Sequence, residues 1–207
     1  GMDVKSLQGF YNKHYHRKVK ESTYENVAVI QTDEVKSSMT LTTLVNAINH
    51  ELSKIVPGIK FSKLWMVNSK EENHKDDKVP YVPHIDYSRY LKAMVYLDDV
   101  KEIDGPIHIA KKSPKEYEKQ RLSLNKDYKE KGENVVKNIT LSGFDPLIGK
   151  AGTLILFDTN CPHFAGKVEA GGSRDVMRFD FELPVWNRRK VSFLSKVKNR
   201  IVRLLNK

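Results

Sequence analysis

The sequence predicts a mainly β fold with flanking helices, built as an antiparallel barrel or sandwich. Several short apolar segments separated by turn signals indicate the strands. One helical pattern precedes these segments and another follows them. The length of 207 residues is typical of one domain and allows a core that needs no disulfide. We therefore expect a single domain over residues 1–207, with a barrel core at about residues 60–184.

The spacing of apolar residues predicts the individual elements. Apolar side chains recur every three or four residues over 39–56, which predicts a helix that ends at Pro57 and Gly58. The turn signal Asp104-Gly105-Pro106 introduces one of the strands. The expected strands are 60–68, 91–99, 105–110, 151–158 and 174–185.

Three basic segments lie outside the strand pattern. The N-terminal stretch is expected to be mobile. Residues 111–137 are dense in Lys and Glu and predict a mainly helical part of an insertion over 111–147. Residues 190–206 predict a basic amphipathic helix. We expect the apolar stripe of this helix to pack on the barrel or on a partner subunit, and peripheral membrane contact through residues 190–207 is the alternative.

Composition narrows the class of protein. The net charge of +10 favours anionic partners such as nucleic acid, anionic membranes, phosphates and carboxylates. The single cysteine, Cys161, excludes an intrachain disulfide, and no segment has the ~20 consecutive apolar residues of a membrane-spanning helix. Because the N-terminus also lacks the apolar core of a signal peptide, we expect a cytoplasmic protein.

A candidate metal site starts at the triplet His84-Ile85-Asp86. On a strand, residues two apart point to the same face, so His84 and Asp86 form either half of a metal site or a polar pair. His163 follows a buried strand, near a strand end at the expected barrel mouth. Two histidines and one carboxylate form the facial triad of non-heme Fe(II) oxygenases, which leaves coordination positions open. Arg174 or Arg178 offers a planar fork to a carboxylate.

The remaining singled-out side chains have ordinary structural interpretations. Core packing is expected for Trp65 and Tyr96, and Cys161 is expected to be a buried, inert thiol. His108 is expected to be structural or to line a pocket. Solvated surface positions are expected for the other four histidines, His14, His16, His50 and His74.

Two segments resemble a known family. The run HIDYSRYLKAMVYLDDVKEIDGPIHIAKKSPK is similar to the H-x-D motif, the strand ending in L-D-D, the N-G-P-L turn and the P-G-S-H-K segment of the phytanoyl-CoA dioxygenase family. GKAGTLILFDTNCPHFAG resembles the A-G-D-L-x-L-F strand and distal histidine of the same family, which belongs to the Fe(II)/2-oxoglutarate oxygenases. The resemblance covers about residues 60–184 and implies a double-stranded β-helix, a jelly-roll or cupin-like barrel.

The resemblance also implies a mechanism. Fe(II) is expected on His84, Asp86 and His163, and the 5-carboxylate of 2-oxoglutarate on Arg174, with Arg178 four residues further along. With O2, such an enzyme hydroxylates a small organic substrate, and the net charge hints at an anionic one.

One departure from the family pattern and one match bear on that mechanism. Ala165 stands where the family often has a hydroxyl residue, so another donor must help to hold 2-oxoglutarate. Two other departures concern the periphery of the barrel, where the P-G-S-H-K segment is reduced to KKSPK and Asn-Gly is Asp104-Gly105. Asp86 is present, whereas related halogenases carry a small residue there, so hydroxylation is expected over halogenation.

The sequence is also compatible with two alternative functions. The net charge suggests a nucleic-acid demethylase of the same superfamily, but the sequence makes no strong case for nucleic-acid binding. A non-catalytic barrel that binds a metal or a ligand is the other alternative. Turnover of 2-oxoglutarate separates an enzyme from such a barrel.

Overall fold

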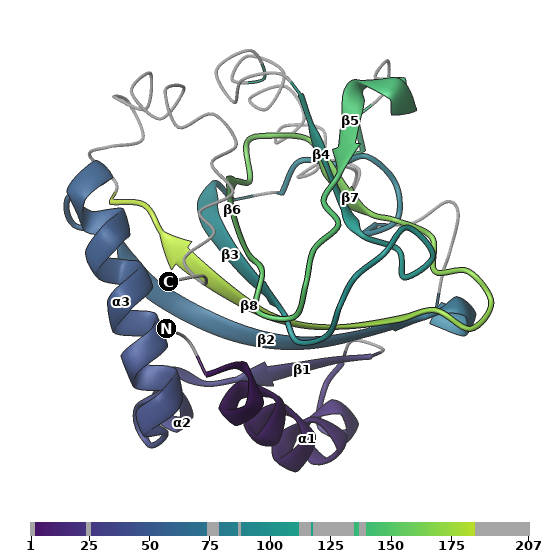
Figure 1. Ribbon diagram of the computed structural model, residues 1–207. Helices are drawn as coiled ribbons and strands as arrows, with labels where there is room; N and C mark the ends of the chain where they lie inside the picture. The colour runs from purple at the N-terminus through teal and green to yellow at the C-terminus, as the bar shows by residue number, and fades with distance from the viewer. Residues whose placement is uncertain are drawn as a thin grey trace.

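The computed structural model describes residues 3–23, 26–73, 79–86, 88–111, 117, 135–136 and 140–184. Two antiparallel sheets form a jelly-roll, a five-stranded sheet in the order β1-β2-β8-β3-β6 and a three-stranded sheet in the order β5-β4-β7 (Figure 1). The strands are β1 Val27–Ile30, β2 Lys60–Lys70, β3 Tyr90–Tyr96, β4 Ile107–Ala110, β5 Phe144–Pro146, β6 Leu154–Asp158, β7 His163–Ala165 and β8 Ser173–Glu182.

Three helices precede the barrel and lie on the side of the larger sheet that faces away from the smaller one (Figure 1). They are α1 Val4–Lys20, α2 Thr32–Lys36 and α3 Met39–Ile55, and two short 3-10 helices, η1 Glu71–Asn73 and η3 Leu141–Gly143, lie elsewhere. The helix predicted over 39–56 is therefore confirmed as α3. Its N-terminus is capped by the Ser38 side chain, which accepts a hydrogen bond from the backbone N–H of Leu41.

The alternation along β8 separates a hydrophobic face of the larger sheet from a polar one. Met177, Phe179 and Phe181 are fully buried, in one cluster with buried side chains of α1 and α3. The residues between them include Arg178 and Asp180, which point into the barrel between the sheets. Burial of the hydrophobic face against the helices stabilises the sheet, and the inner face is left to carry polar groups.

The N-terminal stretch forms a helix, so the expectation that it is mobile is wrong. The Asp3 side chain caps α1, and Leu7, Tyr11 and Tyr15 are buried in the core. These three residues are four apart, which is the spacing of one helix face. The high density of basic residues concealed this signal, because most of the cations lie on the other faces of α1.

Other boundaries also differ from the expected ones. The short strand β1 adds an edge to the larger sheet before the predicted core start at residue 60, and β5 shows that the end of the predicted insertion 111–147 belongs to the smaller sheet. The helix predicted over 111–137 lies almost wholly outside the described residues, and the one over 190–206 lies entirely outside them.

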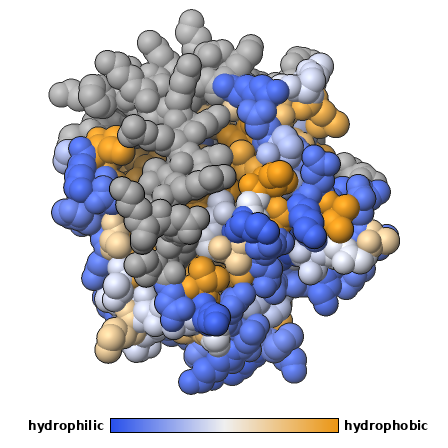
Figure 2. Space-filling model, in the orientation of Figure 1, coloured by the Kyte–Doolittle hydropathy of each residue, from blue (hydrophilic) through white to orange (hydrophobic). Residues whose placement is uncertain are grey.

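On the face seen in Figure 2, hydrophobic side chains form small patches between hydrophilic ones. Within the described residues, no helix is long and apolar enough to cross a bilayer.

Candidate metal and cosubstrate site

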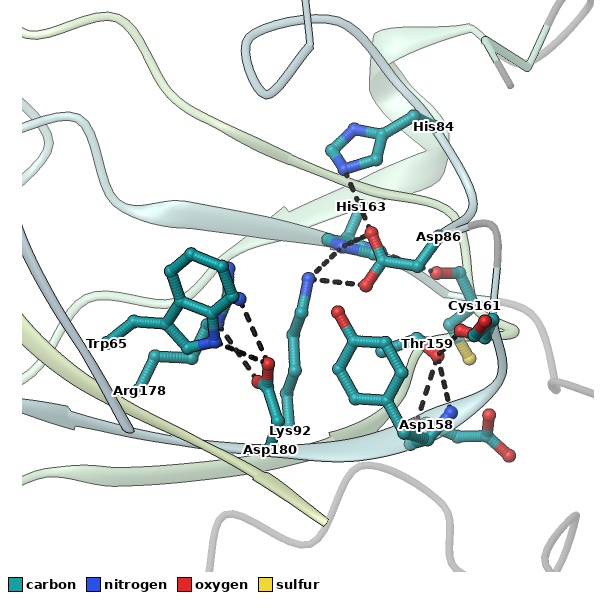
Figure 3. A network of polar contacts seen from close by, with 12 residues as sticks. Trp65, His84, Asp86, Lys92, Asp158, Thr159, Cys161, His163, Arg178 and Asp180 are labelled. Carbon is teal, nitrogen blue, oxygen red and sulfur yellow. Dashed lines mark hydrogen bonds and ion pairs between the residues drawn. The ribbon is translucent and has the colours of Figure 1, made fainter. Parts of the chain in front are cut away.

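The structure brings His84, Asp86 and His163 together between the two sheets. Oδ1 of Asp86 lies 3.6 Å from Nε2 of His84 and 3.7 Å from Nε2 of His163. One ligand atom from each residue lies within 4.8 Å of the other two, and both histidines are buried (Figure 3). The expected convergence of the three side chains is therefore present.

Backbone pairing explains how residues far apart in the sequence meet. His84 and His163 form an isolated antiparallel bridge, in which each backbone N–H donates to the other's carbonyl, at 3.1 and 2.9 Å. The two imidazole centroids are consequently only 4.4 Å apart. Asp86 follows in a loop before β3, so the prediction that His84 and Asp86 share a regular strand is wrong. A single bridge suffices to place them.

Hydrogen bonds to carbonyl groups fix the tautomers of the two imidazoles. Nδ1 of His84 lies 2.8 Å from the carbonyl oxygen of Val82, and Nδ1 of His163 lies 2.9 Å from that of Cys161. A carbonyl oxygen only accepts, so Nδ1 carries the proton in both rings. Each Nε2 therefore turns an unprotonated lone pair towards Asp86, which is the arrangement that a metal ligand needs.

Burial and neighbouring charges set the protonation of the cluster. Burial lowers the pKa of His84 and lowers that of His163 well below its usual value, so both rings are neutral at pH 7. Burial raises the pKa of Asp86, but neighbouring positive charge, above all the ammonium of Lys92, lowers it by more, so Asp86 is a carboxylate. Two neutral nitrogens and one carboxylate oxygen match the donor set of non-heme Fe(II) sites.

Lys92, a residue that the sequence reading did not single out, also reaches this cluster. Its Nζ lies 2.6 Å from Oδ2 of Asp86 and 2.9 Å from Nε2 of His163 (Figure 3). The signal was a single charged side chain inside β3, a strand whose other residues are apolar or aromatic. Because Lys92 alternates with Ala93, it shares the inner face with Met94 and Tyr96.

Arg174 is a buried cation at the start of β8. It is 3% exposed, and its guanidinium donates to the carbonyl of Gly105 and, over 3.3 Å, to the hydroxyl of Ser69. Its Nε has no hydrogen-bond partner among the described residues, and no described carboxylate lies within ion-pair distance of it. A buried cation without a counter-ion can accept an anionic ligand.

Arg178 is already satisfied by the protein. Its Nε and Nη2 each donate to a carboxylate oxygen of Asp180 at 3.0 Å, and its guanidinium lies 4.3 Å from the ring centroid of Trp65. Trp65 in turn donates from Nε1 to Asp180 over 2.6 Å. Trp65 therefore belongs to a polar cluster on the inner face, which the expectation of plain core packing did not include.

The other singled-out residues stay outside the cluster. His108 stacks on Phe164 with centroids 4.5 Å apart, which fits the expected structural role. Cys161 is buried, and burial raises the pKa of its thiol to about 12, so it is inert as expected. Tyr96 is fully buried and donates to the carbonyl of Leu147. His14, His16 and His50 do not join the three residues that converge, and His74 lies outside the described residues.

Comparison with known proteins identifies the family of the chain. A family model described as phytanoyl-CoA dioxygenase (PhyH) matches residues 11–176, which is most of the chain. The chain belongs to the phytanoyl-CoA dioxygenase family. No curated protein sequence matches it. The resemblance expected from the H-x-D and distal-histidine segments is thus confirmed.

Solved structures share the fold at low sequence identity. HygX from Streptomyces hygroscopicus, with nickel and 2-oxoglutarate bound, has a TM-score of 0.59 and 13% identity over 88% of this chain and 78% of that chain. EvdO2 from Micromonospora carbonacea var. aurantiaca has a TM-score of 0.58 and 12% identity over 86% of this chain and 80% of that chain. SnoN, a non-heme alpha ketoglutarate dependent epimerase from nogalamycin biosynthesis, has a TM-score of 0.53 and 15% identity over 87% of this chain and 74% of that chain.

Family membership identifies the chemistry in outline. The phytanoyl-CoA dioxygenase family uses Fe(II), 2-oxoglutarate and O2, and this member is a non-heme Fe(II)- and 2-oxoglutarate-dependent oxygenase. The predicted double-stranded β-helix is confirmed by the two antiparallel sheets and by the neighbours.

Proposed function

We propose that this oxygenase hydroxylates a small organic substrate, with Fe(II) on His84, Asp86 and His163. The convergence of these side chains, with Oδ1 of Asp86 3.6 and 3.7 Å from the two Nε2 atoms, carries the proposal. When bound, the iron activates dioxygen at the expense of 2-oxoglutarate, so that one oxygen atom enters succinate, the other enters the substrate, and carbon dioxide leaves.

The protein's part is to hold the ligands in place. The Val82 and Cys161 carbonyls keep the imidazoles in the tautomer that offers Nε2. Asp86 occupies the carboxylate position, which supports hydroxylation over halogenation, because halogenases need that position for a halide. SnoN is an epimerase with a similar fold, so the fold alone does not choose the outcome, and product analysis must.

Arg174 is the group that we assign to the 5-carboxylate of 2-oxoglutarate. Its support is the buried guanidinium whose Nε has no described partner, whereas Arg178 already has Asp180. Ser69, buried beside the guanidinium, supplies a hydroxyl that can replace the one missing at Ala165. A planar guanidinium and a hydroxyl together provide several donors to one carboxylate.

The balance of charge inside the barrel favours an anionic substrate. Among the described residues, the inner face carries three cations, Lys92, Arg174 and Arg178, against the two carboxylates of Asp86 and Asp180, and the histidines are neutral. A divalent metal and the dianion of 2-oxoglutarate cancel each other, so one positive charge remains for the substrate. HygX has been crystallised with nickel, 2-oxoglutarate and hygromycin B, which supports a small molecule in this kind of barrel.

The first test addresses the metal ligands. Anaerobic addition of Fe(II) and 2-oxoglutarate should give the visible charge-transfer absorption of a chelated complex. This absorption should disappear in His163→Ala and persist in His108→Ala, a histidine of the smaller sheet that lies outside the cluster. Equal absorption in both variants, or loss in both, would refute the assignment of the ligands.

The second test addresses the reaction. We expect succinate release from 2-oxoglutarate to rise with one compound of a panel of acyl thioesters, nucleotides and carboxylated or phosphorylated metabolites. Isotopically labelled dioxygen should place its label in that product. Metal and 2-oxoglutarate binding without succinate would favour the non-catalytic barrel, and a product epimerised without label would exclude hydroxylation.

A further inference from the structure

Lys92 is the most unusual charged residue in the described part of the barrel. Its side chain is 6% exposed, and its ammonium contacts both the carboxylate and one imidazole of the proposed metal site. Burying an ammonium group is costly unless it is paired. Lys92 is the only charged residue of β3, whose other residues are apolar or aromatic, so its contacts within the cluster are what compensate the burial of its charge.

The contact with Asp86 separates the two oxygens of the carboxylate. Oδ2 lies 2.6 Å from Nζ of Lys92, and Oδ1 is the oxygen that faces both imidazoles. An ammonium on Oδ2 fixes the rotation of the carboxylate and leaves only Oδ1 for a metal. Lys92 belongs to β3 of the larger sheet, whereas Asp86 lies on the side of the barrel that faces the smaller sheet. A side chain of the larger sheet therefore sets the orientation of the Asp86 carboxylate (Figure 3).

The contact with His163 has the opposite effect on metal binding. Nε2 of His163 has one lone pair, which accepts from Nζ of Lys92 at 2.9 Å. A metal needs the same lone pair, so the ammonium must release His163 when metal binds, while it can keep Asp86. The positive charge of Lys92 then lies beside the metal cation, and this repulsion weakens the binding of metal in the absence of 2-oxoglutarate.

We propose that Lys92 is a positioning residue that makes metal and 2-oxoglutarate bind cooperatively. It orients Asp86 for binding through one oxygen, and it penalises the divalent ion until the dianionic cosubstrate joins it. This inference rests on the proposed function, because it needs a metal on His163 and Asp86. The coupling is reciprocal, so metal also strengthens 2-oxoglutarate binding more in the presence of this charge.

Removing the charge tests the proposal without any turnover. Titration of the metal-free protein with Ni(II) by calorimetry should show binding that is roughly tenfold tighter, or more, in Lys92→Met. The reason is that repulsion between a divalent and a monovalent cation a few ångströms apart lowers the binding constant by at least about this factor even in water. The enhancement of Ni(II) affinity by 2-oxoglutarate should shrink by a similar factor. Lys92→Arg, which keeps the charge, should retain the wild-type enhancement.

Controls separate this role from a purely structural one. Lys150→Met removes a lysine from an exposed ion pair with Asp99 and should leave both affinities unchanged. Lys92→Gln provides a second uncharged variant if Lys92→Met does not fold. Weaker or unchanged Ni(II) binding in the uncharged variant, or an unchanged enhancement by 2-oxoglutarate, would overturn the proposal.

The outcome also distinguishes this inference from the function on which it depends. Ni(II) binding that is the same in wild type and His163→Ala would refute the metal site itself and this proposal with it. Ni(II) binding that requires His163 but does not respond to Lys92 would leave the metal site intact and refute the role of the lysine alone.

Discussion

Replacing each of the two inner-face arginines by methionine separates their functions. Arg174 has a guanidinium nitrogen without a described partner, whereas Arg178 is bonded twice to Asp180 and stacked on Trp65. Removing one partner of a buried charge pair costs about 2–5 kcal/mol. If the missing partner of Arg174 is 2-oxoglutarate, its dissociation constant should rise roughly 30- to 4,000-fold in Arg174→Met.

Arg178→Met should instead affect folding. The substitution leaves the Asp180 carboxylate, which is 7% exposed, with Trp65 as its remaining described donor. A buried carboxylate that has lost its counter-ion costs about 3–5 kcal/mol of stability. We therefore expect a lower denaturation midpoint in urea. The fraction of Arg178→Met that is folded should bind 2-oxoglutarate with an affinity close to that of wild type.

Calorimetric titration of the Ni(II)-loaded proteins with 2-oxoglutarate measures the first effect, and urea denaturation measures the second. The two measurements together guard against mistaking an unfolded variant for one that has lost its ligand contact. Normal 2-oxoglutarate affinity in Arg174→Met, combined with a large loss in folded Arg178→Met, would reverse the assignment.

Two further predictions concern stability. Tyr11→Phe removes a hydrogen bond of 2.9 Å from Tyr11 to the Asp175 carboxylate and should lower the free energy of unfolding by about 1.5–3 kcal/mol in urea, and a change below about 0.5 kcal/mol would contradict this. Burial raises the pKa of Cys161 to about 12, so the unfolded thiol loses its proton first as pH rises. Stability should therefore fall between about pH 9 and 12 by up to ~1.4 kcal/mol per pH unit more in wild type than in Cys161→Ala, and parallel pH profiles would refute that.

The sequence predicted those parts of the molecule whose signals are local. The period of α3, the alternation in β8 and the two motifs that contain His84, Asp86 and His163 each depend on one segment of the sequence. The helix α1 also had a local signal, in apolar residues four apart, but its many cations suggested a mobile stretch.

The missed features depend on register between strands. Asp180 lies opposite Lys92 in the pairing of β8 with β3, and Trp65 lies opposite Arg178 in the pairing of β8 with β2. The polar cluster of Trp65, Arg178 and Asp180 exists only when these registers are known. Likewise, Lys92 in β3 could be assigned to the cluster only when the bridge between His84 and His163 was known, because that bridge places His163 beside its ammonium group.

The arrangement divides the work of the site between the two sheets. The imidazoles come from β7 and from the bridge beside it, where the paired backbones of His84 and His163 fix their separation. Lys92 and the arginines come from the larger sheet, whose other face is buried against α1 and α3. Because each cation alternates with core residues such as Ala93 and Phe179, the packing under the helices fixes where the charges point. The proposed metal ligands and the proposed anion-binding cations thus belong to different parts of the fold, and Asp86, which pairs with Lys92 and faces both imidazoles, connects them.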